Sequence, residues 1–71
     1  MDCYYCIVST TEDPIAALCV LDALDDEAAL ARGREAAGAV VGWRRVAVYE
    51  GERLVGRVER GAETRALPLA A

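Results

Sequence analysis

The pattern of hydrophobic and polar residues predicts one helix, over residues 25–38, with strands on both sides of it. Asp25 suits the helix N-cap, because its carboxylate can accept hydrogen bonds from the free N–H groups of the first turn. Asp26 and Glu27 follow and place negative charge at the positive end of the helix dipole. Gly38 suits the left-handed residue that closes a helix.

The side of this helix that we expect to be buried carries small residues: Ala29, Leu30, Gly33, Ala36 and Ala37. Only Leu30 is large, and Gly33 has no side chain. A sheet can therefore approach the helix closely, and we interpret Gly33 as a packing position.

Before the helix, residues 3–9 are rich in β-branched and aromatic residues and predict a strand, and residues 10–14 have the composition of a turn. Residues 15–22 are ambiguous, because Asp13 and Pro14 would also suit the start of one long helix over residues 14–37. We favour a second strand, since the aspartates that follow are better explained as the exit of a strand and a new helix cap.

After the helix, residues 44–50 and 53–60 predict two more strands. A loop over residues 50–52 would place Tyr49 opposite Arg53 and Trp43 near Glu59. In that register one face of the hairpin is formed by Val46, Val48, Leu54, Gly56 and Val58. We favour this loop over a two-residue one, which we expect to mix the two faces.

The predicted fold class is therefore α+β: a two-layer β-β-α-β-β domain, in which one helix packs on one face of an antiparallel sheet. We expect residues 1–61 to form this single small domain and residues 62–71 to form a mobile C-terminal tail.

Both faces of the first predicted hairpin are apolar, but one helix can cover only one face of a sheet. The other face would stay exposed to water unless a second chain covers it. We therefore expect a protein interface, either in a homo-oligomer or with another protein, that involves Tyr4, Tyr5, Cys6, Val8, Leu18 and Val20.

Composition supports the expectation of a partner. The chain has 71 residues, of which 55% are hydrophobic, but fourteen of these are alanines and there is no phenylalanine. A core of this kind often needs an oligomer, a metal or a disulfide to supplement it. The net charge of −4 argues against direct binding of nucleic acid.

The chain has no apolar run of about 20 residues that would span a membrane. Its N-terminus also lacks the pattern of a signal peptide. We therefore expect no membrane association and a cytoplasmic protein.

Three cysteines are the main candidates for site chemistry. Cys3 and Cys6 form a CxxC pair and Cys19 is a third thiol, so zinc binding or redox exchange are possible functions. The chain has no histidine, however, and residues three apart on a strand point to opposite faces. We expect free thiols, no metal site and no cofactor.

Catalysis has few candidate groups. Without histidine there is no imidazole base, and Ser9 is the only serine. Capping accounts for Asp25, and we interpret Asp22 and Asp26 as solvated acids rather than as a carboxylate pair. We expect no enzymatic activity.

Two segments carry a resemblance to a known group. The acidic start of the helix, over residues 24–30, and the hairpin over residues 48–55 resemble those of short, uncharacterised bacterial proteins with a β-β-α-β-β pattern. The resemblance covers about residues 5–59, and the CxxC pair is not part of it. It implies the fold and no activity.

The functional hypothesis that we favour is a non-catalytic interaction or regulatory module that acts as a homodimer. One alternative is a small acidic inhibitor, similar to an antitoxin, that binds a macromolecule. The other is a thiol or metal-binding protein that uses Cys3, Cys6 and Cys19.

Overall fold

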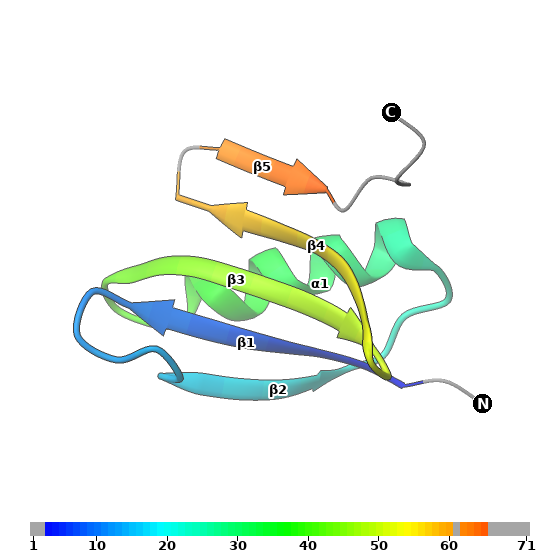
Figure 1. Cartoon of the computed structure of the whole chain (residues 1–71), viewed down its shortest axis with the longest axis horizontal. Helices are drawn as coiled ribbons and strands as arrows, with labels where there is room; N and C mark the ends of the chain where they lie inside the picture. The colour runs from blue at the N-terminus through cyan, green and yellow to red at the C-terminus, as the bar shows by residue number, and fades with distance from the viewer. Residues whose placement is uncertain (1–2, 61, 66–71) are drawn as a thin grey trace.

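The computed structural model describes residues 3–60 and 62–65, which form one antiparallel sheet with a helix packed on one of its faces (Figure 1). The elements are β1 (Tyr4–Thr10), β2 (Ala17–Leu21), α1 (Asp26–Gly38), β3 (Trp43–Glu50), β4 (Arg53–Glu59) and β5 (Ala62–Arg65). The strand order is β2-β1-β3-β4-β5. The two hairpins thus lie side by side, joined by the pairing of β1 with β3, and α1 crosses behind them.

The predicted α+β fold and the order β-β-α-β-β are confirmed. The ambiguous residues 15–22 contain β2, so the long helix that we weighed as an alternative does not form. A further strand, β5, occupies residues 62–65 and pairs with β4, although we had assigned these residues to a mobile tail. The rest of that predicted tail, residues 66–71, lies outside the described residues.

The helix begins as predicted but ends differently. Asp25 is the N-cap, and its Oδ1 accepts a hydrogen bond of 2.8 Å from the N–H of Ala28. Gly38 does not take the predicted left-handed conformation: the helix closes on Ala39, whose φ of −83° is right-handed. In the described residues, Gly42 and Gly51 are the left-handed glycines, and both lie in turns that precede a strand. The structure describes no helix long and apolar enough to cross a membrane.

The core lies between α1 and the covered face of the sheet. It consists of Tyr4, Cys6, Val8, Leu21, Ala29, Leu30, Ala37, Val46, Val48, Val55 and Val58. The helix contributes mainly small residues, as predicted, and Gly33 lies directly against the sheet. A Cβ atom added there would lie 2.6 Å from Cγ2 of Val48, so the sheet occupies the space that a side chain would need.

The predicted register of the second hairpin is wrong. The loop contains two residues, because Glu50 pairs directly with Arg53, and Tyr49 consequently pairs with Leu54 rather than Arg53. The register then shifts between Val48 and Tyr49, which makes Val55 an extra residue on β4. Because of this β-bulge, the buried residues of β4 that follow it face the helix. Contrary to our expectation, the two-residue loop therefore does not place apolar and polar residues on the same face. Likewise Arg45, and not Trp43, is the partner of Glu59.

Candidate interaction surface

The sheet face opposite α1 is covered by none of the described elements, and it is organised in rows across the strands. Cross-strand partners share a face, so the pairings place Val20, Tyr5, Tyr49 and Leu54 in one row. The next row contains Leu18, Ile7, Ala47 and Arg57. Both rows are apolar at β2 and β1, so the apolar part of this open face lies on the first hairpin and its neighbour β3.

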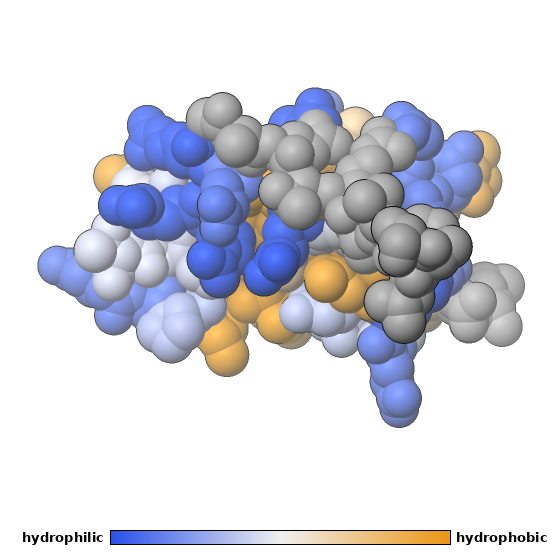
Figure 2. Space-filling view, turned by 45° about the horizontal axis from the view of Figure 1, so that its top comes forward, coloured by the Kyte–Doolittle hydropathy of each residue, from blue (hydrophilic) through white to orange (hydrophobic). Residues whose placement is uncertain are grey.

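The most exposed apolar side chains of the open face lie on β2, at the edge of the sheet. Leu18 is 61% exposed and Val20 is 79% exposed. Apolar surface (orange) is visible in the lower part of Figure 2, below a region of polar side chains (blue). Large hydrophobic side chains that are adjacent on one strand and this exposed are typical of a surface that contacts another molecule.

The structure divides the predicted interface residues into two groups. Tyr5, Leu18 and Val20 lie on the open face, where a partner can reach them. Tyr4, Cys6 and Val8 face α1 and are 7%, 0% and 0% exposed, so they form the core and are not available to a partner. The reason is the strand period: neighbouring residues of β1 point to opposite faces, and the helix covers one of the two.

Two tyrosines stiffen the middle of the open face. The rings of Tyr5 and Tyr49 are stacked, with centroids 5.3 Å apart and planes inclined by 14°. The hydroxyl of Tyr5 also donates a hydrogen bond of 3.1 Å to the carbonyl of Gly51. Tyr49 therefore stacks on a ring from β1 instead of contacting Arg53, which our predicted register had placed across from it. The pair forms a rigid amphipathic platform beside the exposed residues of β2.

A polar cluster on the other face joins the start of α1 to the sheet. The hydroxyl of Tyr4 donates a hydrogen bond of 2.8 Å to Asp26 Oδ1, and Arg53 binds both carboxylate oxygens of Asp26, at 3.0 and 3.2 Å. Arg53 also pairs with Glu50. Asp26 is thus not the simple solvated acid that we had expected.

The titration behaviour of this cluster follows from its hydrogen bonds. The bond from Tyr4 to Asp26 raises the pKa of Tyr4 to about 12, with desolvation as the second cause. Hydrogen bonds to Asp26 and Glu50 raise the pKa of Arg53 above its already high value. Tyr4 and Arg53 are therefore held in the protonation states that they have in water at neutral pH, and we interpret the cluster as a structural tie.

The three cysteines do not form a shared site. Cys6 and Cys19 are partners across β1 and β2, whereas Cys3 is exposed just before β1. All three are free thiols. Among the described residues, no group of three or more histidine, cysteine or acidic side chains is arranged to hold a metal ion.

We expect the three thiols to react with a thiol reagent at very different rates. Cys3 is exposed and should react first, whereas Cys6 is 0% exposed and its burial, with Cys19 as a second cause, raises its pKa to about 11. At pH 8 only about 0.1% of a thiol with this pKa is ionised, and the thiolate is the reactive form. Absorbance after addition of an aromatic disulfide should show Cys6 reacting only when the protein is unfolded.

Two variants test this assignment. Cys3→Ser should remove the fastest phase, and Cys6→Ser should leave that phase unchanged. A fast phase that persists in Cys3→Ser would show that another thiol is accessible.

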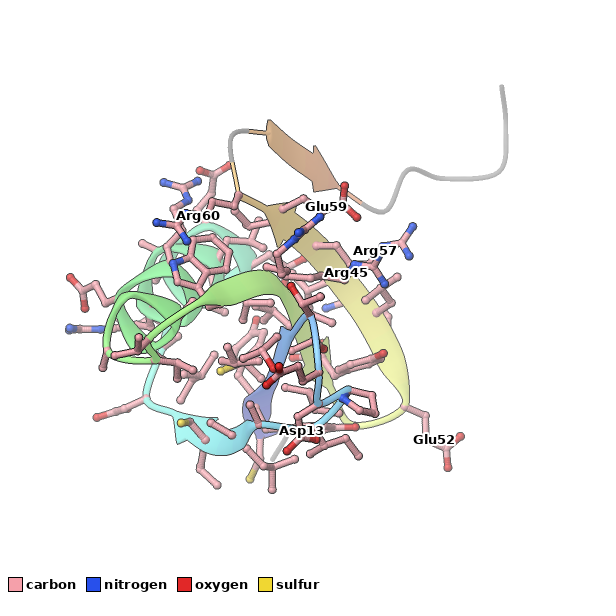
Figure 3. All side chains as sticks on the ribbon, turned by 90° about the vertical axis from the view of Figure 1, so that its left-hand side faces the viewer. Asp13, Arg45, Glu52, Arg57, Glu59 and Arg60 are labelled. Atoms are coloured by element: carbon pink, nitrogen blue, oxygen red, sulfur yellow. The ribbon has the colours of Figure 1, made fainter. Side chains whose placement is uncertain are left out.

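One end of the sheet carries a polar hollow of about 490 Å³, viewed end-on in Figure 3. It lies where β1 ends and β3 begins, and its lining includes Ser9, Thr11, Arg44 and Arg60. Arg45, another lining residue, forms an ion pair of 2.9 Å with Glu59 (Figure 3). Because one carboxylate already offsets part of the positive charge, this hollow is a weaker candidate for ligand binding than the open face.

No protein-family model, curated protein or solved structure matches this chain.

Proposed function

We propose that this chain is a non-catalytic interaction module that acts as a homodimer in the cytoplasm, with the exposed side of the β1–β2 hairpin as its interface. The observation that carries the proposal is the exposure of Leu18 and Val20 beside the tyrosine platform of the open face. No described element covers these side chains.

Energetics favours covering this surface. Burial of apolar area contributes about 25 cal/mol per Å², and a domain of this size buries only a modest fraction of its own surface. The helix contributes one large buried side chain, Leu30, so the core within one copy is small. An oligomer adds buried area that the single chain lacks.

The charge distribution makes a second copy a suitable partner. The chain has a net charge of −4, which disfavours contact between two copies through most of the surface. Residues 14–21, however, contain no charged residue. Two copies can meet at this segment without bringing like charges together. In a two-fold dimer both copies use the same surface, so this one segment can form both sides of the interface.

The test is the solution mass of the full chain, measured by light scattering at tens of micromolar with reductant present. We expect a dimer for the wild type. Val20→Glu should weaken association at least about tenfold, because it places a carboxylate in the centre of the apolar contact. Val41→Glu is the matched control, since Val41 is 97% exposed and lies in the segment before β3, outside β1 and β2.

The control should remain dimeric to the same extent as the wild type. A monomeric wild type, or equal effects of the two substitutions, would contradict the proposal.

A further inference from the structure

We infer that the two copies join edge to edge, by antiparallel pairing of β2 with β2 of the second copy, in the one register that places Cys19 opposite Cys19. This inference rests on the homodimer proposed above and specifies its geometry: the copies meet at the β2 edge of the hairpin, where Leu18 and Val20 lie, and the tyrosine platform stays on the open face of the joined sheet. The result is one continuous sheet with both helices on the same side.

The first ground is that β2 is an unprotected edge. It is the terminal strand in the order β2-β1-β3-β4-β5, so one row of its backbone N–H and C=O groups has no strand partner among the described residues. Natural edge strands are usually protected by charged residues, prolines or bulges. The sequence of β2, ALCVL, contains no charge and no proline, and its pairing with β1 is regular.

The second ground is symmetry. When a two-fold axis perpendicular to the sheet relates two antiparallel strands, it passes between the two copies of one residue. Residues at equal distances before and after that residue then pair with each other, and paired side chains lie on the same face of the sheet. With Cys19 on the axis, all residues of β2 find a partner in β2 of the other copy. Moving the axis to Leu18 or Val20 leaves part of β2 unpaired, and the latter brings Asp22 opposite Leu18 on the apolar face.

The third ground is the match of side chains in this register. Leu18 of each copy lies opposite Val20 of the other, on the open face, and directly opposed side chains are about 5 Å apart at Cβ. Of the large apolar side chains whose burial is described in the strands, these two are the most exposed. Each therefore finds an apolar neighbour, and the apolar rows of the two open faces become continuous.

The helix leaves room for this approach. It packs mainly against β3 and β1, and Gly33 lies against Val48 of β3. Figure 1 likewise shows α1 behind β3 and β4, away from the outer edge of β2. A second copy can therefore reach β2 without meeting the helix of the first.

Cysteine crosslinking tests the register. In Cys3→Ser, which removes the exposed thiol, mild oxidation with copper phenanthroline should link Cys19 to Cys19 and give a covalent dimer on a non-reducing gel. The band should be absent from Cys3→Ser/Cys19→Ser. It should be much weaker in Cys3→Ser/Val20→Glu, which we expect to associate at least about tenfold more weakly and which controls for random collisions.

Amide hydrogen exchange of the Cys3→Ser protein provides a second readout that does not depend on thiol chemistry. Edge pairing protects the outward-facing amides of β2, which should exchange at least about tenfold more slowly in the dimer than in Val20→Glu.

The outcomes separate the two proposals. A dimer by light scattering with neither the crosslink nor the amide protection would overturn the edge pairing, and would indicate that the copies pack through their open faces. A monomer would overturn both proposals. A crosslink together with protected β2 amides would establish the edge-paired dimer.

Discussion

Leu30→Ala is expected to lower the free energy of unfolding by about 3 kcal/mol, whereas Leu24→Ala should change it by less than about 0.5 kcal/mol. Leu30 is 2% exposed and is the largest fully buried side chain of the described residues, and Leu24 is 99% exposed just before the helix. The same atoms are removed in both variants, so the difference between them measures burial alone.

The cost at Leu30 should be near the full value for a buried leucine because the site has little capacity to relax. Its buried neighbours on the helix are alanines and a glycine, which have no side-chain atoms that can move into the space. The facing strands contribute valines, whose χ1 angles are restricted. A domain of this length has a total stability of roughly 4–10 kcal/mol, so the variant loses a large part of it.

Urea unfolding monitored by the fluorescence of Trp43 measures this difference. All samples should be held at one protein concentration, because association would otherwise change the apparent stability. Equal destabilisation by the two substitutions would mean that Leu30 is not part of a packed core.

The features that could be predicted from the sequence are those that depend on local physical chemistry. Asp25 caps the helix through a bond to a residue three positions away, which the sequence order alone makes possible. The small residues of α1 indicate a close approach to the sheet wherever the sheet lies. The acidic residues that follow residues 15–21 indicated a strand exit and a new helix rather than one long helix, and β2 forms there.

The register of the second hairpin could not be predicted, because it depends on packing between distant elements. The alternation of side chains along β4 breaks at Val55, which is an extra residue on this strand. With this residue inserted, Gly56 pairs with Val48 and Val58 pairs with Val46. Nothing in the local pattern marks a bulge there. The end of α1 is similar: Gly38 suits a left-handed cap, but the chain continues through Ala39 and places its left-handed glycine at Gly42.

Only part of the candidate surface could be predicted, because packing between distant elements also decides which face of β1 is exposed. The sequence shows that both faces of β1 are apolar, but it does not show which face the helix covers. Tyr5 and Tyr4 are therefore equivalent in the sequence, while in the structure one lies on the open face and the other in the core. The bonds of Tyr4 and Arg53 to Asp26 join residues 22 and 27 positions apart, and no sequence pattern reveals such a contact.

A large effect of an added side chain is expected at Gly33. Gly33→Leu should destabilise the protein by about 3 kcal/mol, while Gly38→Leu should be neutral or slightly stabilising. Both glycines lie in α1, and leucine has the higher helix propensity at either position. They differ in space: an added Cβ at Gly33 meets Val48 at 2.6 Å, and at Gly38 it meets no atom within 4 Å.

Gly33→Ala separates this packing effect from a general loss of folding. Alanine gains about 1 kcal/mol of helix propensity over glycine, yet its single methyl group must displace Val48, a stiff side chain that is 0% exposed. We expect a net loss of about 1 kcal/mol, because overpacking of a rigid core costs up to about 3 kcal/mol.

In the Val48→Ala background the same substitution should become stabilising, since the new methyl group then fills space that the valine has left. A coupling free energy of at least about 1 kcal/mol between the two positions, measured by urea unfolding of the four proteins, would locate the contact that sets the distance between helix and sheet. If the two effects were additive, Gly33 would not be in contact with Val48, and the close approach of α1 to β3 would have to be explained by other residues.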